Sequence, residues 1–445
     1  MSDERDSFSG KVGFILTAAG AAIGLSCLWR FPYLAAENGG GLFILTYVVL
    51  LAALGIPLLI TKIAIGRKTQ LGVLGAFKKL NPKFSFIGGL CLLVIGLVQP
   101  YYSVLGGEVT NYTFMYLIGQ GAAVAEPGYY DTFISLTAEP LFWFAVFVIL
   151  TGIVCLFGLK NGVERVCKYL MPIEAVILIL LAIYCLTLPG AFEGLYYYLA
   201  PDFSTFSPNT ILVAMGQVFY SLSLGFGIML TFGSYLSKKI NLVNAACSTG
   251  FFTFLISFIA GSVIIPASFL YTNGNPAVLG SGSIFSSLPM VFQTIPLGWI
   301  IGAIFFILLF FAALTSNIAA LEVVVAAFKD RFGIKRPVTV LIGTVYTLAI
   351  GSIICLGYGP LSWIHIGDLH LLEIFDKISG DFLLPVIALL VCIMVGFFLK
   401  RDVILDELKL FTRFRHDKLY LFMIKYFCPI CIIIIFISNI IGAFL

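Results

Sequence analysis

The sequence predicts an all-α membrane protein with about eleven transmembrane helices. Of its 445 residues, 60% are hydrophobic and only 11% are charged. That is too little charge to cover the surface of a soluble protein of this size. Apolar stretches of about 20 residues or more recur along the chain, long enough to cross a hydrocarbon core of about 30 Å. Because lipid offers no hydrogen-bond partners, such stretches form helices.

The expected helices fill one transmembrane domain, residues 1–445. They lie at 12–36, 41–67, 86–119, 139–157, 166–189, 209–236, 242–271, 297–329, 338–357, 373–399 and 417–445. The N-terminal segment MSDERDSFSGK lacks the basic and short apolar regions of a cleavable signal peptide. We therefore expect the first helix to act as an uncleaved insertion signal.

Basic residues indicate the orientation. Alternate loops contain no Lys or Arg, namely 120–138, 190–208, 272–296 and 358–372, whereas the intervening loops carry many. By the positive-inside rule, the basic loops face the cytoplasm. We expect a multi-pass protein of the cell membrane, with the N-terminus inside and the C-terminus outside.

Two helices contain runs of small residues near their middles. The run AAGAAIGLS covers 18–26, and SLSLGFG covers 221–227. Glycine weakens a helix by about 1 kcal/mol per site, although small residues also allow close helix packing. The runs fall in the first and sixth helices, so 12–189 and 209–399 read as two inverted five-helix repeats, with 417–445 as an additional helix. Interrupted helices at matching positions indicate a binding site in mid-membrane.

The first interrupted helix leads into GLSCLWRFPYLAAENGGGLFILTY, and IGR at 65–67, GQVFYSLSLGFG at 216–227 and FFAALTSNIA at 310–319 follow. In these motifs the chain resembles the neurotransmitter:sodium symporter family, especially its bacterial amino-acid transporters with the leucine-transporter fold. The resemblance implies sodium-coupled symport of a hydrophobic or aromatic amino acid by alternating access. A sodium-independent or proton-coupled transporter or exchanger, and a non-transporting amino-acid sensor, are the alternatives.

The resemblance also implies two sodium sites. The second would use carbonyl and hydroxyl oxygens, the ligands that a hard cation prefers, from Gly20, Ile23, Ala312, Thr315 and Ser316. The first site matches the family at the Ala22 carbonyl and the Ser221 hydroxyl, but Cys27 and Thr253 replace two asparagines. We therefore expect a weakened or absent first site and one sodium ion.

Chloride is a further ion to consider. In chloride-dependent relatives a tyrosine, a glutamine and hydroxyls hold the anion, and this pattern is matched by Tyr47, Gln217, Ser221 and Ser257. Chloride-independent relatives usually carry an acidic residue at or close to position 257, and this chain has none there. A lost first sodium would make chloride unnecessary as well, so both outcomes stay open.

The resemblance places the amino acid between the two interruptions. Its carboxylate would meet backbone amides at a half-helix N-terminus and the Tyr102 hydroxyl, and its ammonium would meet carbonyls near Tyr220 and Ser223. Gly24, where monoamine carriers have Asp, favours a substrate with its own carboxylate. The expected site comprises Ala22, Gly24, Leu25, Ser26, Val98, Tyr102, Tyr220, Ser223, Phe226, Ser316 and Ala320.

Charged residues would form two gates. Arg30 and Asp376 would close the outer side, and Arg5 and Asp330, with Tyr235 nearby, would close the inner side. Such charges are usually paired or hydrated in a membrane protein.

Three intramembrane charges depart from the family: Lys62, Glu108 and Glu174. We expect Lys62 to pair with Glu174 or with Glu322, which is common in bacterial relatives. Alternatively, its amine replaces the charge of a cation or carries a proton.

Other chemistry is not expected. Most of the ten cysteines lie in apolar segments and read as free thiols, and the pair Cys428 and Cys431 has no further ligand nearby. The three histidines have no matching nucleophile or metal set, so we expect no enzyme. The expected partners are an amino acid and membrane lipid but no nucleic acid, and the chain would be a monomer or a weak homodimer.

Overall fold

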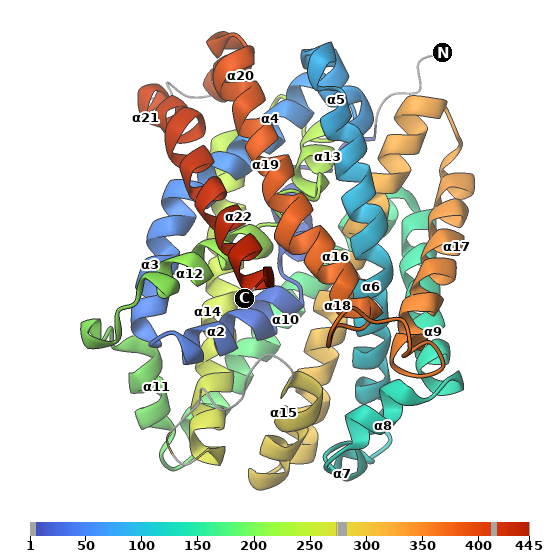
Figure 1. The fold of residues 1–445 in the computed structure, drawn as a ribbon, viewed down its shortest axis with the longest axis vertical. Helices are drawn as coiled ribbons and strands as arrows, with labels where there is room; N and C mark the ends of the chain where they lie inside the picture. The colour runs from blue at the N-terminus through green and yellow to red at the C-terminus, as the bar shows by residue number, and fades with distance from the viewer. Residues whose placement is uncertain (1–5, 273, 275–282, 411–415, 445) are drawn as a thin grey trace.

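The computed structural model describes residues 6–272, 274, 283–410 and 416–444, which fold into a bundle of helices (Figure 1). The first half contains α1 Lys11–Ala22, α2 Phe31–Glu37, α3 Gly41–Leu50, α4 Ile56–Thr69, α5 Val73–Leu80, α6 Phe86–Leu117, α7 Gly121–Val124, α8 Tyr129–Ser135, α9 Ala138–Leu156, α10 Arg165–Leu186 and α11 Ala191–Leu199. The second half contains α12 Pro208–Ser221, α13 Ile228–Ser234, α14 Leu242–Tyr271, α15 Ser283–Thr294, α16 Gly298–Phe332, α17 Arg336–Cys355, α18 Leu371–Asp376, α19 Leu384–Ile393, α20 Arg401–Lys409, α21 Asp417–Phe422 and α22 Cys428–Phe444.

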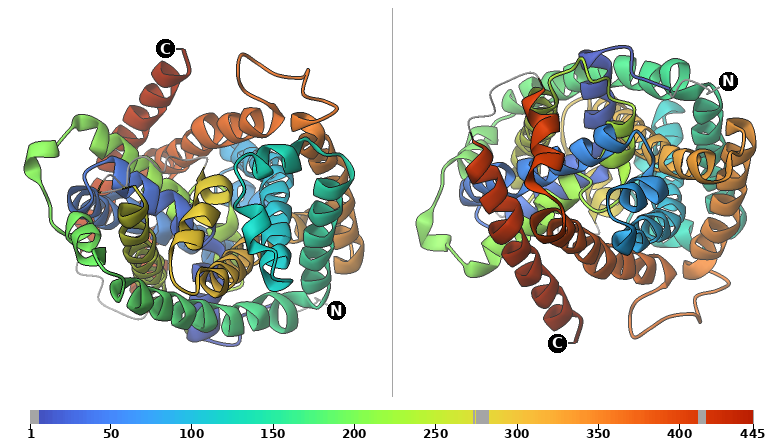
Figure 2. Two further views of the ribbon diagram at one scale, coloured as in Figure 1. Left: turned by 90° about the horizontal axis from the view of Figure 1, so that it is seen from below. Right: turned by 90° about the horizontal axis from the view of Figure 1, so that it is seen from above.

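Wider π-helical turns join several of these helices into longer rods. They lie at Ser26–Arg30, Leu51–Gly55, Leu159–Glu164, Lys377–Leu383, Met394–Phe398 and Met423–Phe427. Seen along the long axis of the molecule, the C-terminal helices α21 and α22 lie at the edge of the bundle (Figure 2).

The all-helical membrane fold is confirmed, but the count of spans differs from eleven. Within the described residues, nine helices are long and apolar enough to cross a membrane, or ten if one bent pair is a single span. The predicted sixth helix, 209–236, consists of α12 and α13, which are 14 and 7 residues long. Neither half alone is long enough to span a bilayer.

Both predicted interruptions are present. Lys11–Ala22 and Ser26–Glu37 meet at an angle of 65°. Residues 222–227 separate α12 from α13, and Ser223, Gly225 and Gly227 there have φ values of 50°, 112° and 79°. These left-handed conformations are incompatible with a continuing right-handed helix and favour glycine.

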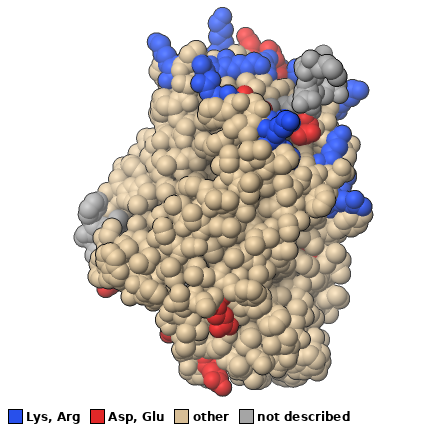
Figure 3. All heavy atoms as spheres, turned by 90° about the vertical axis from the view of Figure 1, so that its right-hand side faces the viewer, with Lys and Arg blue, Asp and Glu red and all other residues tan. Residues whose placement is uncertain are grey.

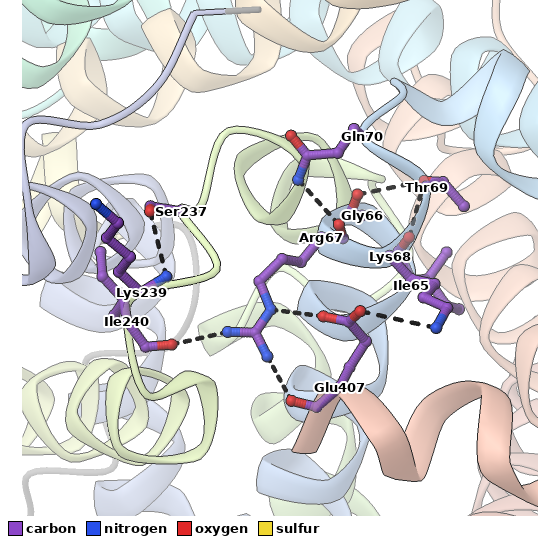
Figure 4. A network of polar contacts seen from close by, with 10 residues as sticks. All are labelled: Ile65, Gly66, Arg67, Lys68, Thr69, Gln70, Ser237, Lys239, Ile240 and Glu407. Carbon is purple, nitrogen blue, oxygen red and sulfur yellow. Dashed lines mark hydrogen bonds and ion pairs between the residues drawn. The ribbon is translucent and has the colours of Figure 1, made fainter. Parts of the chain in front are cut away.

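The charged surface is strongly polarised. Lys and Arg gather at one end of the face drawn in Figure 3, and at its opposite end the charged residues in view are Asp and Glu. At the basic end, the buried Arg67 of α4 links its helix to α20 and to the segment before α14 (Figure 4). Its guanidinium donates to the Glu407 carboxylate over 2.9 Å and to the Ile240 carbonyl over 2.8 Å.

The expected pairing of Lys62 is wrong. Glu322 forms an ion pair with Arg336 instead, because the loop after α16 brings Arg336 back onto that helix. Among the described residues, neither the Lys62 amine nor the Glu174 carboxyl has a hydrogen-bond partner. Glu108, the third departure from the family, accepts a hydrogen bond from Tyr130.

Candidate functional site

The end of α1 and the middle of α16 form an oxygen-rich cluster. Thr315 Oγ1 lies 3.1 Å from the Gly20 carbonyl oxygen and 3.2 Å from that of Ala312. Ser316 Oγ lies 3.3 Å from the Gly20 and 3.4 Å from the Ile23 carbonyl oxygen. Two hydroxyl groups carry only two protons, so the carbonyl acceptors outnumber the donors. The structure thus brings together all five oxygen groups of the predicted second sodium site, and this chemistry fits a small hard cation.

The predicted first sodium site has a different chemistry. Cys27 Sγ donates to the Ala22 carbonyl oxygen over 3.4 Å, and Thr253 Oγ1 donates to the Thr249 carbonyl over 2.9 Å. A thiol is a poor ligand for sodium, whereas the Thr253 hydroxyl keeps its oxygen lone pairs while it donates, as Thr315 does. Ser221 Oγ accepts from the Gln217 amide over 3.0 Å. This set fits sodium poorly.

The predicted chloride residues lie beside this region. Gln217 Nε2 also donates to the Ser26 carbonyl over 2.7 Å, and Ser257 Oγ donates to the Thr253 carbonyl over 3.0 Å. The Tyr47 hydroxyl is fully buried and has no partner among the described residues. An anion would thus meet the Tyr47 hydroxyl and the proton of the Ser221 hydroxyl, while the Gln217 amide and the Ser257 hydroxyl donate elsewhere.

A cavity of about 710 Å³ begins at the two helix interruptions. The eleven predicted substrate-binding residues all line it: Ala22, Gly24, Leu25, Ser26, Val98, Tyr102, Tyr220, Ser223, Phe226, Ser316 and Ala320. The cavity continues past Trp29, Tyr33 and Tyr130 to Tyr358 and Glu373. A large amino acid therefore has room in the described structure, with a route toward the end of the molecule that carries α8.

The turn at Gly24 is closely surrounded. The Leu25 amide donates to the Tyr102 hydroxyl over 3.4 Å, and the Ser223 hydroxyl donates to the Ala21 carbonyl over 3.2 Å. A Cβ at Gly24 would lie 2.6 Å from the Tyr102 hydroxyl and 2.8 Å from Ser316 Oγ. A side chain at this position would have to displace Tyr102 or Ser316, so glycine keeps the backbone open to a ligand.

The outer charged residues have separate partners. The Arg30 guanidinium lies 3.9 Å from the centroid of the Tyr220 ring, and Asp376 accepts a hydrogen bond from Tyr101 over 2.8 Å. In the described structure Arg30 and Asp376 form no ion pair with each other. Above them, Tyr130 of α8 donates to Glu108 over 3.2 Å, and burial keeps the pKa of Tyr130 well above its usual value.

The described residues include only part of the predicted inner gate. Arg5 lies outside the described residues. The Asp330 carboxylate accepts from the Gly72 amide over 2.6 Å, and the Tyr235 hydroxyl donates to Glu322 over 2.9 Å. These contacts join α13, α16 and the start of α5 at the basic end of the molecule.

Sequence reasoning missed two polar cavity residues, Gln99 and Asn317. Gln99 stands directly before Pro100, inside α6. Pro100 has no amide hydrogen, so the Gly96 carbonyl loses its helical partner, and the Tyr346 hydroxyl of α17 donates to that carbonyl over 2.9 Å. The sequence does show that Gln99 and Asn317 are polar residues in otherwise apolar helices. Only the fold shows that both line the same cavity.

Comparisons with known proteins give the family of the chain. The profile of the sodium:neurotransmitter symporter family matches residues 5–121 and 135–443. An uncharacterized sodium-dependent transporter of Haemophilus influenzae is 35% identical, with 98% of each chain covered. A sodium- and chloride-dependent taurine transporter of Rattus norvegicus is 26% identical over 91% of this chain and 73% of its own length.

A solved structure is also similar. The crystal structure of MhsT in complex with L-phenylalanine superposes with a TM-score of 0.87 at 37% identity, covering 98% of this chain and 100% of that one.

Proposed function

Because the chain belongs to the sodium:neurotransmitter symporter family, we propose that it moves a hydrophobic or aromatic amino acid into the cell together with sodium. The observation that carries this proposal is the convergence of the Gly20, Ile23 and Ala312 carbonyls with the Thr315 and Ser316 hydroxyls next to a cavity of about 710 Å³. The solved relative holds phenylalanine, which supports an amino acid of this size.

The amino acid would bind across the two interruptions. Its carboxylate would lie near Gly24 and Leu25, where the backbone is open and the Tyr102 hydroxyl is within reach. Its ammonium would meet carbonyl oxygens beside Ser223. Two short half-helices provide these groups because their terminal amides and carbonyls have no intrahelical partners. Sodium, as the co-transported ion, would lie between α1 and α16, so its binding would draw these two elements together.

We propose one sodium ion per cycle, because the Cys27 thiol stands where the first site needs an amide oxygen and is a poor ligand for sodium. We also propose that the two interrupted helices belong to inverted repeats, 12–189 and 209–399, and that the basic end in Figure 3 faces the cytoplasm. On this orientation the cavity opens to the outside.

Alternating access would require Arg30 and Asp376 to change partners. In the described structure they contact Tyr220 and Tyr101, so the outer route is not closed by an ion pair. Closure would bring the two charges together above the amino acid. The inner contacts of Asp330 and Tyr235 would then have to separate.

The test is uptake by proteoliposomes that contain the purified full-length chain. Each of the twenty amino acids is tested separately in radiolabelled form. Every test is run with an inward sodium gradient, with equal sodium on both sides, and with potassium in place of sodium. We expect concentrative uptake of an aromatic or large aliphatic amino acid only with the gradient. Uptake that is indifferent to sodium would reject sodium coupling and support a proton-coupled carrier or an exchanger; binding without uptake or counterflow would indicate a sensor.

A further inference from the structure

The Gln99 carboxamide is a buried polar group without a protein partner. Its side chain is 3% exposed and lines the cavity. It forms no hydrogen bond with any residue that the structure describes. A buried amide has two donor hydrogens and an acceptor oxygen, and buried polar groups are nearly always paired. Because this group borders the ligand cavity, the missing partner is best supplied by the ligand.

Asn317 provides an acceptor on the same wall. Its amide nitrogen donates to Ser103 Oγ and to Thr151 Oγ1, each over 3.0 Å. Its Oδ1 lies 3.3 Å from Ser103 Oγ. The single Ser103 proton is directed at the Gln99 carbonyl, however, over only 2.7 Å. The Asn317 Oδ1 atom therefore accepts only a long bond from Ser103 and keeps a lone pair for a second donor.

Ser103 links α6 to α16 beside the two amides. It bonds the backbone of Gln99 one turn away on α6 and also contacts the Asn317 side chain on α16. Their neighbours in the cavity wall are apolar, including Ile95, Val98 and Ala320. The result is a small polar patch inside an apolar pocket, which is the usual arrangement of a specificity determinant.

The patch lies within reach of a substrate side chain. Tyr102, whose hydroxyl marks the expected carboxylate position, is three residues from Gln99 on the same helix. At 1.5 Å per residue, the two positions are separated by about 4.5 Å along the helix axis. An aromatic side chain extends over a similar distance from its α-carbon.

We propose that Gln99 and Asn317 form a hydrogen-bonding subsite for the tip of the substrate side chain. The preferred substrate is then a neutral aromatic amino acid that carries a side-chain donor, as tyrosine and tryptophan do, rather than a pure hydrocarbon side chain. A donor is favoured because Asn317 offers only its oxygen, and Gln99 can turn its oxygen toward the same group. This inference rests on the proposed amino-acid transport and refines its substrate.

The site would distinguish tyrosine from phenylalanine through the hydrogen-bonding capacity of the Gln99 and Asn317 amides. A ligand without a donor would displace water from the pocket and leave the amides unsatisfied, whereas the phenol of tyrosine would donate to one amide oxygen and accept from the Gln99 nitrogen. Sites of this kind reject the analogue that lacks the polar group much more strongly than apolar pockets reject an extra methylene. We expect at least a tenfold difference in affinity between tyrosine and phenylalanine.

The test measures equilibrium binding to the full-length purified chain by scintillation proximity in saturating sodium. L-[3H]tyrosine and L-[3H]phenylalanine serve as probes for the wild type, Gln99→Met and Gln99→Leu. Because the Gln99 side chain forms no hydrogen bond with a described residue, neither variant removes an internal hydrogen bond. We expect both variants to weaken tyrosine binding at least tenfold and to change phenylalanine binding less than threefold. The matched control Gln120→Met alters an exposed glutamine beyond the end of α6 and should keep the wild-type ratio.

A second measurement needs no variant. The wild type should bind tryptophan at least tenfold more tightly than 1-methyl-tryptophan, which lacks the indole donor. Binding of phenylalanine or leucine with rejection of tyrosine and tryptophan would overturn the subsite and leave the transport function intact. An unchanged tyrosine-to-phenylalanine ratio in both Gln99 variants would do the same. If none of the twenty amino acids binds, the proposed function falls and the subsite falls with it.

Discussion

The Thr315 hydroxyl lies 3.1 Å from the Gly20 carbonyl oxygen and joins α16 to the last turn of α1. The same hydroxyl is also within 3.1 Å of the Phe311 carbonyl and 3.2 Å of the Ala312 carbonyl. One proton satisfies only one of these acceptors well. A cation at this point would satisfy several together, which makes this contact the most direct place to test sodium binding.

Thr315→Val should weaken sodium binding at least tenfold, about 1.4 kcal/mol, because it replaces one oxygen ligand by a methyl group of similar size. Saturable binding of 22Na⁺ to the purified chain measures the effect. Thr347→Val, a buried threonine that bonds its own helix at Gly343, is the control and should bind sodium normally. Equal sodium affinity in the wild type and Thr315→Val would contradict the assigned site.

Gly24→Ala should abolish amino-acid binding while leaving the fold intact. The added Cβ would lie 2.6 Å from the Tyr102 hydroxyl and 2.8 Å from Ser316 Oγ, so it would occupy the space of the substrate carboxylate. Loss of labelled amino-acid binding, with an unchanged elution profile on size exclusion, is the expected result. Gly216→Ala is a matched control because nothing lies within 4 Å of its Cβ position. Normal binding by Gly24→Ala would place the carboxylate elsewhere.

The double variant Cys27→Asn with Thr253→Asn should restore a first sodium site. Two carboxamide oxygens would replace a thiol and a hydroxyl that donate to the Ala22 and Thr249 carbonyls. We expect the sodium dependence of amino-acid binding to change from a single-site curve to a steeper, cooperative one. Cys185→Asn, in the α10 helix, is the control for the loss of a buried thiol. A cooperative curve already present in the wild type would refute the proposal of one sodium.

Arg67→Ala should destabilise the protein by about 3–5 kcal/mol, because it leaves the Glu407 carboxylate buried without its main partner. Arg67 is fully buried, and Glu407 is 4% exposed. The measurement is the unfolding temperature in detergent. Lys68→Ala is the control, since Lys68 is 35% exposed and its amine lies 3.9 Å from Glu407. Similar unfolding temperatures for the two variants would show that the network in Figure 4 contributes little.

Lys62→Met should raise the unfolding temperature and leave sodium-coupled uptake unchanged. The Lys62 side chain is 3% exposed, and its amine has no hydrogen-bond partner in the described structure. Burying an amine without a partner is unfavourable, and more so in its charged form, whereas methionine has a similar length and carries no charge. If uptake loses its sodium dependence or fails in this variant, the amine has a role in ion coupling rather than an unpaired place in the core.

The sequence predicted the interrupted helices because glycine-rich runs and family motifs are local signals. The eleven residues that it predicted to bind the substrate all line the cavity, but it did not single out Gln99 or Asn317. It did not predict that Glu322 pairs with Arg336 of the next helix rather than with Lys62. The sequence does not show which of the two basic side chains lies closer to Glu322 in the folded chain. Gln99 was missed for a related reason: its importance depends on Ser103 and Asn317, which reach it only through the packing of α6 against α16.

The bond from Tyr346 to the Gly96 carbonyl has a consequence for how selectivity survives the transport cycle. A proline in a long helix is ordinarily a place where the rod can flex. Here a phenol from α17 fills the gap that Pro100 leaves, so the segment bearing Gln99 is braced against its neighbour. We therefore expect this part of the cavity wall to move less than the two interrupted helices when the protein changes from outward-facing to inward-facing.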